Sequence, residues 1–230
     1  MRLLGMIGGM SAESTVPYYR QINAHVAARL GGLHSARLLI YSVDFAEVAQ
    51  LQSQDRWDDA GQLLAACARA LCGAGAQGLI LCTNTMHKVA PAIEAAVDVP
   101  FLHIADVVAQ ALRASGLREV GLLGTRFTME QAFYRERLQQ HGIGVRVPGE
   151  ADRDLVHRVI FEELCKGRIE ASSRQAFREV IARLADQGAE AVVLGCTEIG
   201  LLIGPEDSPL PLFDTTSLHA RAAAEFVLEG

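Results

Sequence analysis

Two cysteines stand at matching places in two similar stretches of the chain. Residues 75–83 read GAQGLILCT and residues 188–197 read GAEAVVLGCT, so Cys82 and Cys196 each follow a short apolar run and precede a threonine. They lie 114 positions apart, which is about half of the 230-residue chain. Either cysteine alone is explained well enough as a small buried residue. The matching positions of the pair indicate a shared chemical role.

The chemistry that fits two such thiols is the inversion of a carbon stereocentre. A base must remove the proton from one face of the carbon and an acid must return a proton to the other face, because a single base tends to return the proton where it came from. A thiol suits both roles, since its reference pKa of about 8.5 is tuned by burial and by helix N-termini. The sequence therefore predicts that Cys82 and Cys196 act on opposite faces of one substrate carbon.

Small and polar residues follow the other predicted strands as well. In open α/β sheets, ligands bind beyond the carboxyl ends of the strands. Hydroxyl, amide and backbone N–H groups in such loops can bind a carboxylate. We expect substrate contacts from these loop residues: Met10, Ser11, Thr83, Asn84, Thr85, Thr125, Thr197 and Glu198.

Nucleotide and metal motifs do not occur in this sequence. The glycines of residues 5–9 lack the full GxGxxG spacing, and no Gly-Lys-Ser or Gly-Lys-Thr follows a glycine run. No His, Cys or carboxylate pair has a ligand spacing such as HExxH, and His87 and His103 are expected to be packed, hydrogen-bonded residues. We therefore expect no metal and no cofactor. The remaining cysteines fall on predicted helices and are expected to be inert core thiols: Cys67, Cys72 and Cys165.

Short apolar runs alternate along the chain with longer segments of helical period. The predicted strands are residues 3–7, 37–42, 78–81, 120–123 and 191–194, and the predicted helices are residues 60–71, 107–114, 130–140 and 174–186. This rhythm predicts βαβ units and parallel sheets. A second internal similarity, GMIG of residues 5–8 with GLLG of residues 121–124, supports two pseudo-symmetric α/β halves.

We expect the halves to be residues 1–105, carrying Cys82, and residues 106–230, carrying Cys196. Each half should contain a parallel sheet covered by helices, with the active site between the halves and a C-terminal helix able to pack back on the first half. Half of the residues are hydrophobic but only 6% are aromatic, which is typical of sheets covered on both faces.

Charge and cysteine content restrict the partners of the protein. A net charge of −6 argues against a nucleic-acid surface or a polybasic membrane patch, and no segment approaches the length of a membrane span. Five cysteines without a CxxC pair indicate reduced thiols and a cytoplasmic location. A small soluble ligand is therefore the expected partner.

The motifs around these residues resemble those of the aspartate/glutamate racemase family over nearly the whole chain. The resemblance rests on MIGGMS of residues 6–11, CTNTMH of residues 82–87 and GCTE of residues 195–198. It implies an amino-acid racemase that uses no cofactor, with Cys82 and Cys196 as acid and base. It also implies two α/β halves, a homodimer, and carboxylate and amine binding by Asn84, Thr85 and Thr197.

The same resemblance bears on the substrate. It implies that Lys166, in CKG of residues 165–167, helps to recognise the distal group and that the loop of Thr125 belongs to the pocket. Aspartate-specific members carry Asp-Arg-Thr after the second strand, where this chain reads Ser42-Val43-Asp44-Phe45, and Arg126 is a candidate replacement for the missing arginine. Aspartate or glutamate is favoured, and a broader set of amino acids stays open.

Other activities of the superfamily remain as alternatives. They are racemisation of hydantoins, isomerisation of maleate and decarboxylation of arylmalonates, for which some members keep only one reactive cysteine. A non-enzymatic protein that binds an amino acid is the further alternative, and the intact pair of Cys82 and Cys196 opposes it.

Overall fold

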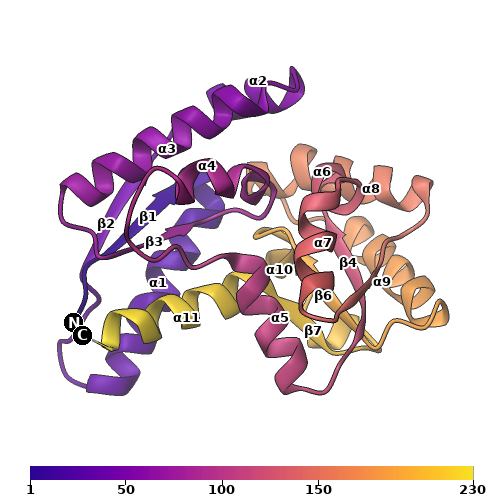
Figure 1. The fold of residues 1–230 in the computed structure, drawn as a ribbon. Coiled ribbons are helices and arrows are strands. Elements are labelled where there is room, and N and C mark those ends of the chain that lie inside the picture. The colour runs from indigo at the N-terminus through magenta and orange to yellow at the C-terminus, as the bar shows by residue number, and fades with distance from the viewer. Residues whose placement is uncertain (230) are drawn as a thin grey trace. The chain divides into compact units, whose positions relative to one another are not determined.

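The apolar runs of the sequence form the strands of two parallel sheets in the computed structural model, which describes residues 1–229 (Figure 1). Contacts between residues divide the chain into two units. The first unit contains Met1–Ile104 and the chain from His219 onward, and the second contains Ala105–Leu218. The predicted fold class, α/β with two parallel sheets covered by helices, is confirmed.

The first unit is built on a sheet with the strand order β2-β1-β3. Its elements, in chain order, are β1 Leu4–Gly8, α1 Ala12–Leu30, β2 Leu38–Ser42, α2 Phe45–Ser53, α3 Trp57–Gly73, β3 Gly78–Leu81, the 3-10 helix η1 Thr85–Val89 and α4 Ala90–Glu94.

Alternate residues of β1 and β3 enter two different core clusters, one on each face of this sheet. Ile7 and Leu81 pack in a cluster with residues of α2, α3 and α4, such as Leu64. Met6 and Ile80 pack in the other cluster, together with residues of α1 and of the last helix. Burial on both faces explains why these strands read as continuous apolar runs.

The second unit contains a sheet with the strand order β5-β4-β6-β7. Its elements are α5 Ile104–Ala114, β4 Glu119–Gly124, α6 Arg126–Glu130, α7 Ala132–Gln140, β5 Gly144–Arg146, α8 Glu150–Glu162, the 3-10 helix η2 Leu164–Lys166, α9 Ala171–Asp186, β6 Ala191–Gly195, α10 Ile199–Leu202, the 3-10 helix η3 Pro205–Asp207 and β7 Leu212–Asp214, after which the chain continues into α11 Thr215–Leu228.

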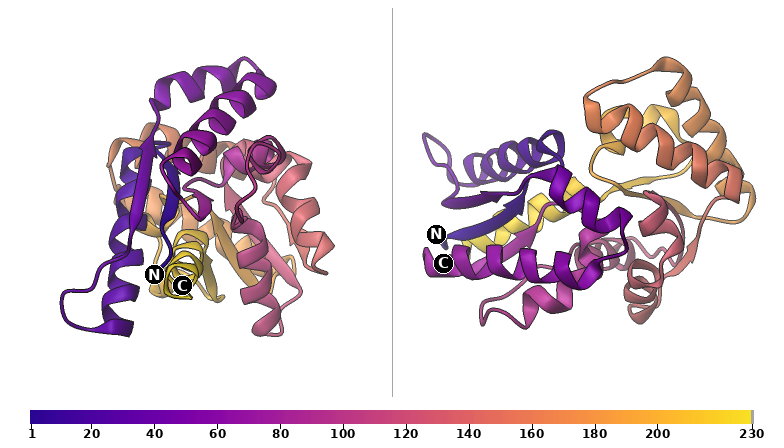
Figure 2. Two further views of the ribbon diagram at one scale, coloured as in Figure 1. Left: turned by 60° about the vertical axis from the view of Figure 1, so that its left-hand side comes forward. Right: turned by 90° about the horizontal axis from the view of Figure 1, so that it is seen from above.

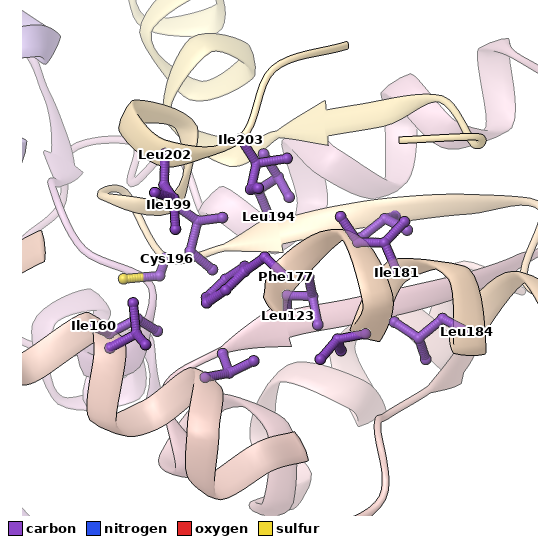
Figure 3. Close-up of a cluster of buried hydrophobic side chains, with 14 of the residues drawn as sticks. Leu123, Ile160, Phe177, Ile181, Leu184, Leu194, Cys196, Ile199, Leu202 and Ile203 are labelled. Atoms are coloured by element: carbon purple, nitrogen blue, oxygen red, sulfur yellow. The ribbon is translucent and has the colours of Figure 1, made fainter. Parts of the chain in front are cut away.

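One face of this second sheet is covered by α8 and α9. Leu123 of β4 and Leu194 of β6 pack there against Phe177 and other apolar side chains of these helices (Figure 3). Leu122 and Val193, which neighbour them in the strands, are fully buried as well. The sheet is therefore shielded from water on both faces, as the apolar runs predict.

The last helix, α11, is divided between the two units. Its residues 215–218 lie in the second unit and its residues from His219 onward lie in the first. In the first unit it packs Ala220, Ala223 and Val227 into the cluster that contains Met6. Figure 2 shows this helix in yellow, beside the sheet of the first unit. The backbone N–H of Arg2 donates to the carbonyl oxygen of Val227 at 2.9 Å, so the two ends of the described chain are neighbours.

Two features of the second unit differ from the sequence-based expectation. The segment predicted as one helix over residues 130–140 is divided into α6 and α7, because Gln131 has an extended ψ of 149°. The strands β5 and β7 are absent from the prediction.

No helix within residues 1–229 combines the length and the apolar character that crossing a membrane requires.

Candidate active site

The strands of the first unit end at one edge of the sheet, and the predicted site residues of this unit follow them. The backbone N–H of Cys82 donates to the carbonyl oxygen of Ile7 at 2.9 Å, and that of Val43 donates to Gly8 at 3.0 Å. The loops after β1, β2 and β3 are therefore neighbours. This confirms the arrangement expected for strand ends in a parallel sheet.

The loop after β1 is folded tightly onto the loop after β2. Gly9 has a φ of 92°, and a Cβ atom there would lie 2.4 Å from the backbone oxygen of Val43. Only glycine fits this position without a shift of the backbone. The side chain of Met10 packs in the core with α2 and α3, and the N–H of Ser11 donates to Ser14 Oγ at 3.1 Å at the start of α1.

The thiol of Cys82 lies in an apolar environment. Its side chain is completely buried among residues that include Met6, Tyr18 and Ala220. Burial raises the pKa of the Cys82 thiol, because a thiolate loses its hydration there. The group is therefore a neutral thiol at neutral pH in the protein without substrate.

His87 holds the backbone of the loop that follows Cys82. Its Nδ1 lies 2.7 Å from the carbonyl oxygen of Thr83, and the N–H of Ile104 donates to its Nε2 at 3.2 Å. A carbonyl oxygen can only accept, so Nδ1 carries the hydrogen and the ring is neutral. The expectation of a packed, hydrogen-bonded histidine is confirmed for His87, whose ring also stacks edgewise on His103 at 4.5 Å between centroids.

The second unit presents an equivalent edge. Gly124 at the end of β4 is paired with Gly195 at the end of β6, and Thr125 and Cys196 are the residues that follow. Thr125 caps α6 by accepting a hydrogen bond from the N–H of Thr128. Thr125 and Cys196 are therefore brought to one edge of the second sheet.

Cys196 differs from Cys82 in having a carboxylate beside it. Its Sγ donates to Oε2 of Glu198 at 3.0 Å, and the hydroxyl of Thr197 donates to the same oxygen at 2.6 Å. Burial raises the pKa of the Cys196 thiol, and the negative charge of Glu198 raises it further. Figure 3 shows the sulfur of Cys196 directed away from Phe177, at the margin of the core cluster.

A third thiol lies at the same carboxylate. Cys165 of η2 donates from Sγ to Oε1 of Glu198 at 3.6 Å, and its pKa is raised by burial and then by the charge of Glu198. The expectation of a core thiol omits this polar contact, although Cys165 does pack against the core cluster. The segment from Glu163 to Lys166 turns out of α8, and the thiol of Cys165 lies beside the loop after β6 as well as against the core cluster.

The two basic residues considered for the distal group have different surroundings. Lys166, next to Cys165, has an exposed side chain. The guanidinium of Arg126 forms ion pairs with Asp154 and with Glu130, the latter at 3.7 Å. Arg126 would have to leave these carboxylates before it could bind a substrate, which makes it the weaker candidate of the two.

In the first unit, Asp44 lies in the loop after β2, where the chain lacks the basic Asp-Arg-Thr motif. Asp44 accepts a hydrogen bond from the N–H of Ala46 at 3.0 Å and caps α2. This side chain is therefore used to begin a helix.

Within residues 1–229, no group of three or more His, Cys, Asp or Glu side chains is arranged to hold a metal ion.

Comparison with known proteins agrees with the resemblance of the motifs. The family model of Asp/Glu/hydantoin racemases matches residues 7–223. The chain belongs to this racemase family.

Solved structures of family members extend the comparison to the whole fold. A protein of Yersinia pestis, provisionally assigned as an Asp/Glu racemase, is 55% identical, with a TM-score of 0.93 over 99% of this chain and 100% of its own. An aspartate racemase homologue from Pyrococcus horikoshii is 33% identical, with a TM-score of 0.85 over the same shares. The broad specificity amino-acid racemase RacX of Bacillus subtilis is 21% identical over 98% of both chains.

Proposed function

We propose that this member of the family is a cofactor-independent amino-acid racemase in which Cys82 and Cys196 are the acid and the base. One observation carries the proposal. Each thiol is the first residue after a strand of a parallel sheet, Cys82 after β3 in the first unit and Cys196 after β6 in the second. Two thiols at matching strand ends are what a two-base inversion requires.

In the proposed reaction, one cysteine acts as thiolate and removes the α-hydrogen as a proton, leaving the C–H electron pair on the carbon. The other cysteine, as a neutral thiol, gives its proton to the opposite face of the carbanion. The reverse reaction exchanges the two roles. The surroundings that raise the pKa of both thiols also make each thiolate a stronger base once it has formed.

The polar groups beside the thiols suggest how the amino acid is held. Thr197 uses its hydroxyl hydrogen on Glu198, so the lone pairs of its oxygen remain for a substrate ammonium group. Thr83, Asn84 and Thr85 follow Cys82 at the edge of the first sheet, where N–H and hydroxyl groups suit a carboxylate. Lys166 is our candidate for binding a distal carboxylate.

Aspartate or glutamate is the substrate that we favour. The Pyrococcus relative is described as an aspartate racemase homologue, and an exposed lysine suits an acidic side chain. A broad set of amino acids is the second candidate. It is favoured because Asp44 caps α2 in the loop where a basic motif would bind a distal carboxylate. It is favoured also by the similarity to the broad specificity racemase of Bacillus subtilis.

Exchange of the α-hydrogen in D₂O tests the proposal directly. The purified protein is incubated with each common L and D amino acid, and deuterium uptake and enantiomer ratio are followed together. The wild-type protein should exchange and invert at least one amino acid, with no loss of activity after dialysis against a chelator. Cys82→Ser and Cys196→Ser should each abolish inversion, because a hydroxyl is far too weak a base near neutral pH.

The pattern of residual exchange is the sharper readout. Each single variant keeps one thiol and should still exchange the α-hydrogen of one enantiomer, with opposite preference in the two variants. Full inversion by either variant would contradict the two-base assignment. Inversion of a hydantoin, or decarboxylation of an arylmalonate, without exchange of any amino acid would identify another reaction of the superfamily.

A further inference from the structure

The loop that follows Cys82 ends at a lysine whose charge lies against an aromatic ring. Lys88 is part of η1, and its Nζ lies 3.7 Å from the centroid of the Trp57 ring. Trp57 is the first residue of α3 and the only tryptophan of the chain. A cation over the face of an indole ring is attracted by the negative charge of the π system. The contact therefore ties this loop to the beginning of α3.

A neighbouring carboxylate fixes the orientation of the ring. Nε1 of Trp57 donates a hydrogen bond to Asp55, in the turn between α2 and α3. Asp55 has a φ of 56°, in the left-handed region, which aspartate tolerates better than most residues. The bond holds the edge of the indole, so its face stays toward Lys88. Burial lowers the pKa of the Lys88 ammonium, and the negative charge of Asp55 opposes this effect.

The hairpin of α2 and α3 contacts the same loop at a second point. Nε2 of Gln52, a buried residue of α2, donates to Sδ of Met86 at 2.8 Å. Met86 and Lys88 both belong to η1. A cavity of about 540 Å³ borders the Lys88 contact, with Pro91 in its lining. This space leaves the loop room to move outward when the contact with Trp57 is lost.

The residues that we expect to bind the substrate carboxylate lie between two fixed points. At one end, the N–H of Cys82 donates to the carbonyl oxygen of Ile7 at 2.9 Å, which fixes the end of β3. At the other end, Lys88 lies on Trp57. Thr83, Asn84 and Thr85 stand between them. Fixing both ends of a short segment restricts the backbone conformations that it can adopt.

We propose that Trp57 is a positioning residue: by holding Lys88, it keeps Thr83, Asn84 and Thr85 in the conformation that receives the substrate carboxylate. This rests on the proposed function where binding of a substrate is concerned. The hold of Trp57 on the loop is a property of the protein alone, and it is measured separately.

Hydrogen–deuterium exchange of the protein without ligand tests the hold. Lys88→Met keeps an unbranched side chain but removes the charge, whereas Lys88→Arg keeps the charge. The amides of residues 83–88 should exchange roughly three- to tenfold faster in Lys88→Met than in the wild type, because opening of the loop no longer breaks the contact. Lys88→Arg should restore most of the protection, and the amides of β1 should exchange alike in all three proteins.

Two further variants separate the contact from a general loss of stability. Trp57→Leu should match Lys88→Met at residues 83–88, because either substitution removes the same contact. Arg2→Met is the matched control. The Arg2 guanidinium lies 4.8 Å from the centroid of the Phe226 ring in the same unit, so this variant removes a cation from a ring without touching the loop. It should leave the exchange of residues 83–88 unchanged.

Steady-state kinetics with aspartate, or with the amino acid that the D₂O screen identifies, tests the link to substrate binding. Lys88→Met should raise KM about fivefold and leave kcat within about twofold of the wild type, because the carboxylate is held alike in the ground state and the transition state. Lys88→Arg should recover most of the affinity, and Arg2→Met should have the wild-type KM.

Several results would overturn the inference. They are equal exchange of residues 83–88 in Lys88→Met and the wild type, equal effects of Lys88→Met and Lys88→Arg, and faster exchange that extends to β1. Faster exchange of the loop with an unchanged KM would overturn its role in holding the substrate. If the wild type inverts no amino acid, the proposed function fails, while the exchange of residues 83–88 still decides whether Trp57 holds the loop.

Discussion

At the scale of single residues, the two proposed catalytic thiols are not equivalent. Cys82 is surrounded by apolar side chains, and burial alone raises its pKa. Cys196 shares a hydrogen bond with Glu198, whose charge adds to the effect of burial. The two halves of the sequence thus supply matching thiols in different electrostatic surroundings, and kcat need not be the same in the two directions, although kcat/KM must be, because the two enantiomers have equal free energy.

Lys166 offers a test of substrate recognition at this scale. Its ammonium group is exposed beside Cys165 and can attract an acidic distal group. Lys166→Met, which keeps an unbranched chain but removes the charge, should raise KM for acidic substrates about tenfold or more and leave kcat nearly unchanged. Steady-state kinetics with an acidic and a neutral amino acid measures this, and an equal loss for both substrates would indicate a structural role.

The positions of Cys82 and Cys196 at strand ends could be predicted from the sequence, because an apolar run followed by a polar turn marks the end of a buried strand. The contact of Cys165 with Glu198 could not. The two residues lie 33 positions apart, and their contact depends on how η2 turns out of α8. The motif Cys-Lys-Gly marks a turn, but it does not show which way the thiol points.

At the scale of elements, the ends of β4 and β6 require glycine on both strands. A Cβ atom at Gly195 would lie 2.9 Å from the backbone oxygen of Leu123, and one at Gly124 would lie 2.8 Å from the backbone oxygen of Gly195. Backbone atoms of paired strands cannot move apart without breaking the ladder. The glycine that precedes Cys196, and has no counterpart before Cys82, is therefore explained by close strand contact.

Gly195→Ala should destabilise the protein by about 1 to 3 kcal/mol, because the added methyl group meets backbone atoms that have no room to shift. The measurement is the free energy of unfolding from urea denaturation. Gly73→Ala at the end of α3 is the matched control, since nothing lies within 4 Å of a Cβ atom there, and it should leave stability unchanged or slightly raised. Equal effects of the two substitutions would contradict this account.

All five strands predicted from apolar runs are present, with ends that differ by one residue at most. The missed strands β5 and β7 contain three residues each and lie at the two edges of the second sheet. None of their residues is fully buried, so no apolar run marks them in the sequence. Edge strands of this length are defined by pairing with a neighbour, which local sequence does not encode.

At the scale of the whole molecule, His219 links stability to pH. The ring is fully buried, its Nε2 donates to the carbonyl oxygen of Leu102 at 2.8 Å, and its Nδ1 accepts from the hydroxyl of Tyr18 at 3.0 Å. Burial lowers the pKa of His219 from 6.5 to about 4, with a smaller effect of the neighbouring His103 in the same direction. The folded protein therefore keeps this histidine neutral.

The sign of the effect on stability follows from this depressed pKa. The unfolded chain binds a proton at His219 below about pH 6.5, whereas the folded protein does so only below about pH 4. The stabilisation from the neutral ring is complete above pH 6.5 and is lost as pH falls toward 4, by roughly 3 kcal/mol in total. Unfolding free energies measured between pH 7 and pH 4 should show this loss.

His219→Gln should flatten that dependence, because the amide keeps hydrogen-bonding groups but does not titrate. His34→Gln, at an exposed position, is the matched control and should retain the wild-type slope. A slope that is the same in His219→Gln as in the wild type would show that other groups cause the loss of stability in acid.

The path of α11 has a consequence for how the chain is made. The ribosome delivers the chain from its N-terminus, and domains that are continuous in sequence can fold as they emerge. The first unit cannot do so completely, because Ala220, Ala223 and Val227 of α11 belong to the core that surrounds Cys82. A nascent chain that has exposed only residues 1–104 presents that apolar surface to water. This unit can be completed only after the second unit has been synthesised, and until then a holding chaperone would find its binding surface on the face of the sheet that carries Cys82.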